Sequence, residues 1–117
     1  MKLGDCYEAA VKFVMRDFDC IINKPDCKYH IVHAEVLGQG ALAGTPFGHG
    51  FVVDTEDDMV IDTSNGRNIR MPRAVYFAIG RIDEIDNYIE YTFGEASKKI
   101  VDTGHYGPWD LETSTGL

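Results

Sequence analysis

Two short apolar runs separated by a polar tip constrain this chain more than any other feature of its sequence. Residues 49–54 and 59–62 are mostly apolar, and residues 55–58 between them are Thr-Glu-Asp-Asp. This pattern is typical of a β-hairpin with a polar turn. If the turn pairs Asp54 with Met59, the register of the whole hairpin follows from the length of the turn.

That register brings a histidine and a carboxylate together. Side chains along a strand alternate between the two faces of a sheet. His49, near the start of the first run, therefore shares a face with Asp62, at the end of the second, and the two are diagonal neighbours within reach of each other. A turn shorter by one residue would move Asp62 to the opposite face, so the predicted contact depends on the turn length.

A cysteine stands at the start of a predicted helix. Apolar residues recur at spacings of three and four over residues 5–16, as in an amphipathic helix. Asp5 suits the N-cap position with Glu8 three residues later, which makes Cys6 the first helical residue. The unpaired N–H groups and the positive dipole end of a helix stabilise a thiolate and can bind an oxyanion. A thiol, a base and an orienting carboxylate are what a nucleophilic cysteine site requires.

The rest of the pattern predicts one mixed domain. We expect strands at 29–37 and 87–91, an extended piece at Arg81-Ile82, a loop at 38–48, and helices at 72–79 and 92–101, the last capped by Thr92 and Glu95 and ended by Gly104. The predicted fold class is α+β, an N-terminal helix packed on a small antiparallel sheet. We expect residues 1–117 to form a single domain, with 112–117 frayed.

Composition excludes several kinds of partner. A net charge of −8 opposes binding to nucleic acid, because that affinity comes largely from Lys and Arg. No apolar run approaches the about 20 residues that span a bilayer, so we expect no membrane association. The first five residues lead into polar sequence rather than a secretory core, which predicts a cytoplasmic protein. Three cysteines, an odd number, then favour reduced thiols.

A zinc site is the alternative use of the remaining cysteines. Cys20, Cys27, His30 and His33 offer thiolate and imidazole ligands, which suit zinc. Their spacing differs from the usual zinc patterns, and the two histidines would point to opposite faces of a strand. We therefore expect no metal and no cofactor, with Cys20 and Cys27 as small buried residues. His105 is a rival candidate for the base.

The order Cys, His, Asp on a helix start and two consecutive strands resembles the papain-like cysteine enzyme superfamily, in its transglutaminase-like branch, to which NlpC/P60-type peptidases are related. Residues 48–53 (GHGFVV) and 60–64 (VIDTS) are similar to the histidine strand and the aspartate strand of that branch, and residues 4–7 (GDCY) to its nucleophile segment. The resemblance covers residues 4–65. Segments 65–67 and 104–109 are also similar to small bacteriophage proteins, which would act in the host cytoplasm.

The resemblance implies that Cys6 is the nucleophile, His49 the base and Asp62 the acid that orients the base. Two positions depart from the family: Tyr7 replaces a tryptophan that often follows the nucleophile, and Gly50 separates His49 from the next aromatic residue.

These features predict a cysteine-dependent acyl-transfer enzyme with a peptide or protein substrate, acting as a peptidase, amidase, deamidase or transglutaminase-like enzyme. Gln39, Tyr7 and Trp109 are the candidates for oxyanion or substrate binding. The alternative function is a non-catalytic viral or bacterial protein-binding module that retains the fold. The sequence leaves the oligomeric state open.

Overall fold

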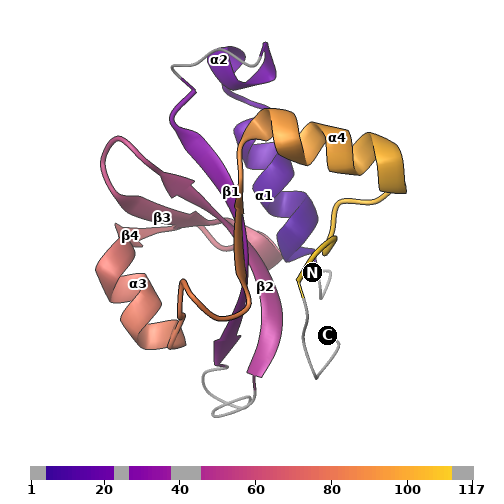
Figure 1. Cartoon of the computed structure of the whole chain (residues 1–117). Coiled ribbons are helices and arrows are strands. Elements are labelled where there is room, and N and C mark those ends of the chain that lie inside the picture. The colour runs from indigo at the N-terminus through magenta and orange to yellow at the C-terminus, as the bar shows by residue number, and fades with distance from the viewer. Residues whose placement is uncertain (1–4, 23–26, 38–45, 112–117) are drawn as a thin grey trace.

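One five-stranded antiparallel sheet, with helices on both faces, organises the chain (Figure 1). The computed structural model describes residues 5–22, 27–37 and 46–111. Within these residues the strands are β1 (Tyr29–Leu37), β2 (Pro46–Asp54), β3 (Met59–Asp62), β4 (Ile69–Pro72) and β5 (Tyr88–Tyr91). The helices are α1 (Cys6–Val14), α2 (Phe18–Ile21), α3 (Arg73–Gly80) and α4 (Phe93–Thr103), and a short 3-10 helix, η2 (Ser64–Gly66), follows β3. The predicted α+β class is confirmed.

The sheet separates two apolar cores. The strand order is β4-β3-β2-β1-β5, so β2 is the central strand. One core combines residues of α1 and α4 with Ile31, Val52 and Ile61. The other combines Val32, Phe51 and Val60 with partly buried residues of α3. Successive residues of one strand contribute side chains to different cores. A shift of one residue in register would therefore move the apolar side chains out of both cores.

The predicted hairpin register is confirmed. Asp54 pairs with Met59 across a four-residue turn. The side chain of Asp54 accounts for the length of this turn, because its Oδ1 accepts from the backbone N–H groups of Glu56 at 3.0 Å and Asp57 at 3.1 Å. The Asp54 carboxylate is fully buried, and Arg70 balances its charge with a 3.0 Å hydrogen bond.

Other elements differ from the sequence prediction. Strand β2 begins at Pro46, inside the predicted loop, because it pairs with the far end of β1. Strand β4 was not predicted. The prediction of an extended piece at Arg81-Ile82 is wrong, because Arg81 is the left-handed residue that ends α3. The predicted cap of α4 is confirmed: Thr92 and Glu95 form a reciprocal capping box, and Gly104 follows the helix with φ 78°.

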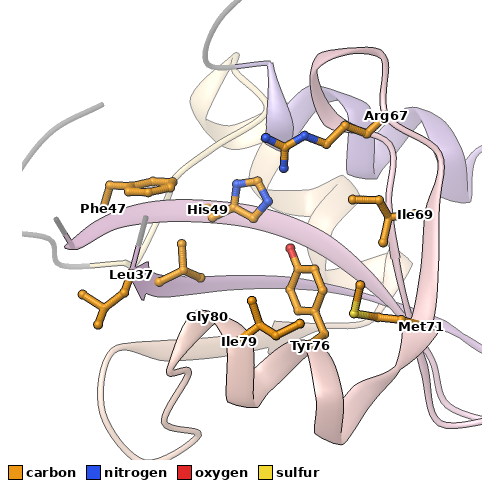
Figure 2. Close-up of a pocket in the computed structure, with 10 residues that line it drawn as sticks. Leu37, Phe47, His49, Arg67, Ile69, Met71, Tyr76, Ile79 and Gly80 are labelled. Carbon is orange, nitrogen blue, oxygen red and sulfur yellow. The ribbon is translucent and has the colours of Figure 1, made fainter. Parts of the chain in front are cut away.

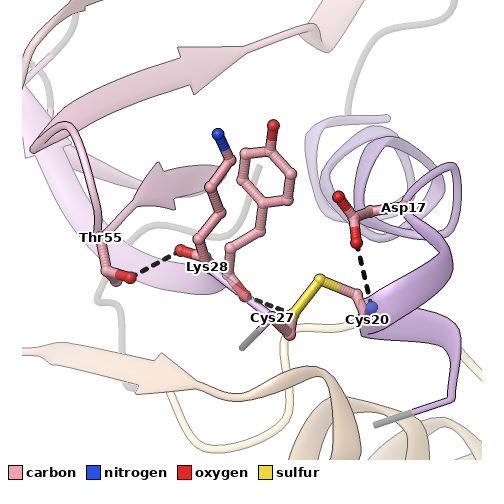
Figure 3. The surroundings of a disulfide bond; sticks show 6 residues. Asp17, Cys20, Cys27, Lys28 and Thr55 are labelled. Atoms are coloured by element: carbon pink, nitrogen blue, oxygen red, sulfur yellow. Dashed lines mark hydrogen bonds between the residues drawn. A yellow bond between two sulfur atoms is a disulfide. The ribbon is translucent and has the colours of Figure 1, made fainter. Parts of the chain in front are cut away.

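Cys20 and Cys27 form a disulfide, which corrects the prediction of reduced thiols (Figure 3). A separate helix, α2, begins after Asp17, whose side chain accepts from the Cys20 N–H at 3.1 Å and so holds one half of the pair in place. The disulfide removes both thiolates from the alternative zinc site. No group of metal-ligating side chains occurs in the part of the chain that the structure describes. Cys6 is the free cysteine.

Replacing both Cys20 and Cys27 by alanine should lower the free energy of unfolding by about 2 kcal/mol. The two cysteines are 7 residues apart, and opening so short a loop releases a moderate amount of chain entropy in the unfolded state. Urea unfolding of the variant against the oxidised wild type measures the difference. The control is the wild type in a reducing agent, which should lose a similar amount. Equal stability of all three samples would contradict the prediction.

No helix among the described residues has the length and apolarity needed to cross a membrane.

Candidate active site

His49 and Asp62 meet on the α3 face of the sheet, as the hairpin register predicted. Their contact joins His49 Nε2 to Asp62 Oδ2 at 3.0 Å. His49 is 9% exposed and Asp62 1% exposed, so this hydrogen bond lies out of bulk solvent. With Nε2 bonded to the carboxylate, the imidazole is fixed in orientation and its Nδ1 is left for a second group.

Asp62 is held ionised by a complete set of donors. Its Oδ1 accepts from the backbone N–H of Ser64 at 2.9 Å and from the Ser64 hydroxyl at 2.6 Å. Its Oδ2 accepts from the Tyr76 hydroxyl at 2.8 Å in addition to His49. Burial disfavours the charged form, but the hydrogen bonds from His49 and Ser64 outweigh it and hold the pKa of Asp62 well below its usual range.

Cys6 approaches the same histidine from the opposite face of the sheet. It is the first residue of α1, and that helix packs on the other face, against β2. The register pairs only Val52 to Asp54 of β2 with β3, so β2 continues past the end of its neighbour. There the Gly50 N–H donates to the Cys6 Sγ at 3.4 Å. The thiol therefore reaches His49 around the end of β3 rather than through the sheet.

Glycine at position 50 makes this approach possible. A Cβ there would lie 2.8 Å from Tyr7 Cδ1 and 3.1 Å from Tyr7 Cα. A side chain would push the first turn of α1 away from β2 and carry Cys6 with it. The glycine at this position therefore has a packing cause.

The start of α1 is tied to the turn after β3. Asp5 precedes the helix as predicted, but its side chain makes no capping hydrogen bond. Its Oδ1 instead accepts from the backbone N–H of Asn65 at 2.9 Å, in η2. Because Ser64 of the same turn binds Asp62, one short segment positions both the cysteine helix and the carboxylate.

His49 carries a proton at neutral pH in this arrangement. Burial lowers its pKa, but hydrogen bonds to Asp62 and to Cys6, with the charges of both groups, raise it to about 9. An imidazolium between a carboxylate and a sulfur stabilises the thiolate form of a cysteine. The three groups can therefore supply a nucleophile and a proton donor at once.

A hollow of about 290 Å³ opens beside His49 on the α3 side of the sheet. Its polar lining comes from His49, Arg67 and Tyr76, and Figure 2 shows the Arg67 guanidinium and the Tyr76 hydroxyl directed toward the imidazole. Its apolar walls are Val36, Leu37, Phe47, Ile69, Met71 and Ile79. Sequence reasoning missed Arg67 and Tyr76, because neither lies in the hairpin or at the helix start that carried the prediction.

The other predicted site residues lie elsewhere. Tyr7 is buried, with its ring 4.7 Å from His33 and at a steep angle to it. Trp109 packs 4.9 Å from the same imidazole, and neither aromatic residue lines the hollow. The rival base His105 is exposed, and its Nδ1 accepts from the Gly107 N–H at 3.1 Å. Gln39 lies outside the described residues.

No protein-family model matches this chain, and comparison with curated proteins and with solved structures finds no match either.

Proposed function

We propose that this protein is a cysteine-dependent acyl-transfer enzyme related to the papain-like superfamily, in its transglutaminase-like branch. One observation carries the proposal: the Cys6 sulfur, at the start of α1, interacts with an imidazole whose Nε2 is bound to the buried Asp62 carboxylate. Cys6, His49 and Asp62, which we call the relay, come from three distant chain segments.

The chemistry follows from the protonation of the relay. The Cys6 thiolate attacks a substrate carbonyl carbon, and the C–N bond breaks as the His49 imidazolium gives its proton to the leaving amine. Neutral His49 then takes a proton from water, or from an acceptor amine, which attacks the thioester and releases Cys6. Asp62 keeps the imidazole in one orientation throughout and stabilises its charged form.

The start of α1 also supplies a donor for the developing negative oxygen. The first N–H groups of a helix have no acceptor within the helix itself. The backbone N–H of Cys6 is therefore the proposed oxyanion donor, close to the attacking sulfur. A peptide or protein amide is the proposed substrate.

One observation favours the alternative of a non-catalytic protein-binding module. Cys6 is 7% exposed and His49 is 9% exposed, so both reactive groups are largely covered. In a binding module these residues would serve only to hold α1 against the sheet. The reactivity of the sulfur separates the two functions, because packing alone gives it no dependence on His49.

Labelling with iodoacetamide between pH 6 and 8 should show a thiol whose rate changes little with pH. His49 retains its proton up to its pKa of about 9, so its positive charge beside the sulfur persists over this range. In His49→Gln the rate should fall by about tenfold or more at pH 6 and rise with pH, as for an ordinary thiol. His105→Gln, which removes an exposed imidazole, is the control and should behave as the wild type. A wild type that follows the His49→Gln profile would favour the binding module.

The cytoplasmic location predicted from the sequence, in a host cell if the protein is phage-encoded, stays a prediction. The Cys20–Cys27 disulfide would be unusual there, because cytoplasmic thiols are kept reduced. Thiol trapping in intact cells would show which state the pair adopts.

A further inference from the structure

The hollow between α3 and the sheet is lined by His49 but not by Cys6. In the proposed reaction the acyl group stays on Cys6, whereas His49 protonates the leaving amine. A surface that includes the proton donor and not the nucleophile lies on the side of the leaving group. We infer that this hollow is the leaving-group subsite, and that the leaving amine is an apolar amino acid with a free carboxylate. The inference rests on the acyl-transfer function proposed above.

The walls of the hollow select an apolar side chain. They come from four elements, β1, β2, β4 and α3, together with Arg67 between η2 and β4. Six of the lining residues are aliphatic, phenylalanine or methionine, and the volume of about 290 Å³ can enclose a side chain of the size of leucine, methionine or phenylalanine. A charged side chain would lose its hydration against these apolar walls, and the Arg67 guanidinium would already be bound by the terminal carboxylate.

Arg67 selects the carboxylate. Its Nη1 lies 4.0 Å from Asp62 Oδ2, beyond hydrogen-bond distance, and 54% of its side chain is exposed. Asp62 already accepts four hydrogen bonds at 2.6 to 3.0 Å, so its oxygens do not require the guanidinium. A guanidinium binds a carboxylate through two parallel hydrogen bonds. In a chain of net charge −8, this local positive group decides where an anion can approach.

Together these contacts define the reaction as removal of a C-terminal apolar residue from a peptide or other N-acyl amino acid. The Cys6 sulfur bonds to the carbonyl carbon, the C–N bond breaks, and the His49 proton goes to the amine of the departing amino acid. Water then hydrolyses the thioester, gives one proton to His49 and leaves the shortened carboxylic acid. The reaction needs no oxidant, reductant or further co-reactant.

Binding to the Cys6→Ala protein tests the subsite without any catalytic step. N-acetylglycyl-leucine with a free carboxylate should bind in an NMR titration and shift the resonances of residues that line the hollow. The same peptide as its carboxamide should bind about tenfold more weakly or worse, because the Arg67 contact is lost. N-acetylglycyl-aspartate should lose a similar factor. Equal affinities for acid and amide, or shifts confined to another surface, would overturn the inference.

Matched variants in the Cys6→Ala background locate the binding. Ile79 lines the hollow and Val75 does not, although both lie on α3 and are 50% and 48% exposed. Ile79→Gln should weaken binding by about tenfold, whereas Val75→Gln should leave it within about twofold. Arg67→Gln should weaken it by a similar factor, with Arg16→Gln, at an exposed site after α1, as its control. Equal losses in a variant and its control would contradict the assignment.

The two proposals fail in distinguishable ways. If the peptide does not bind to the Cys6→Ala protein but the pH profile of iodoacetamide labelling depends on His49, the subsite is wrong and the acyl-transfer function stands. If the peptide binds as expected and the labelling shows an ordinary thiol, the hollow is a carboxylate-binding site in a non-catalytic protein, and its assignment to a leaving group is overturned.

Discussion

Replacing Asp62 by asparagine should slow acylation of Cys6 by about 100-fold and lower the free energy of unfolding by about 2 to 4 kcal/mol. Each oxygen of Asp62 accepts two hydrogen bonds, one oxygen from Ser64 and the other from His49 and Tyr76. An amide presents an N–H₂ group in place of one of these oxygens, whichever way it turns. Two buried donors then lose their acceptor, and the charge that holds His49 protonated is gone.

The rate is measured with p-nitrophenyl acetate, which acylates a reactive thiol and releases a coloured phenolate, and the stability by urea unfolding. Asp54→Asn is the matched control, because Asp54 is equally buried in the same hairpin but its partners are the turn, Arg70 and Lys28. It should lower stability and leave the rate per folded molecule unchanged. An Asp62→Asn protein that is acylated at the wild-type rate would exclude the proposed relay.

The pH dependence of this stability difference has a definite sign. The pKa of Asp62 is lower in the folded protein than in the unfolded chain, where it is about 3.9. Its contribution is therefore fully present above that value and is lost as pH falls through the folded pKa. The difference between wild type and Asp62→Asn should therefore shrink below about pH 4, and it should also shrink as pH rises from about 6.5 to 9, because Asp62 helps to raise the pKa of His49 to about 9.

The sequence was sufficient for the His49–Asp62 contact because that contact depends on local features. The turn length fixes the register, and the register fixes which side chains share a face. The approach of Cys6 to His49 depends instead on where one strand ends and on a contact between distant residues. Strand β3 ends at Asp62 while β2 continues, and only a glycine at position 50 lets α1 come close enough. The periodicity of apolar residues in the sequence reveals neither of these two conditions.

The parts of the structure that sequence reasoning missed all depend on pairing across the fold. The segment Ile69–Pro72 becomes strand β4 only because it pairs with β3, since its own four residues include a proline. Arg67 and Ile69 reach the hollow because β4 lies beside the end of β3. The Cys20–Cys27 disulfide likewise needs α2 as a separate helix before β1, whereas the sequence predicted only the helix at 5–16 before the strand at 29–37.

His33 should make the protein about 3 kcal/mol less stable at pH 4 than at pH 7, in excess of any other acid effect. Its ring is fully buried among Tyr7, Tyr91 and Trp109, at centroid distances of 4.7 to 5.1 Å. Within the described residues neither ring nitrogen has a hydrogen-bond partner. Burial lowers the pKa of His33 to about 4, against a smaller opposing effect of Asp110. The folded protein therefore keeps this imidazole neutral where the unfolded chain protonates it.

The sign follows from the protons bound in each state. Between about pH 6.5 and 4 the unfolded chain binds the extra proton, so stability falls as pH falls, by up to about 1.4 kcal/mol per pH unit. Comparison of wild type with His33→Phe by urea unfolding isolates this effect. His49 and the buried carboxylates titrate in both proteins and cancel in the difference. A phenyl ring that packs poorly changes the absolute stability but not its pH dependence.

His105→Gln is the control for this comparison, because it removes an exposed imidazole from the segment that carries Trp109. It should retain the wild-type dependence on pH, whereas His33→Phe should lose it. If the two variants and the wild type gave parallel curves from pH 4 to 7, His33 would not be an unpartnered neutral imidazole in the folded protein. The packing of Tyr7 and Trp109 around it would then need another explanation, and with it the position of the first turn of α1, which Tyr7 shares with Cys6.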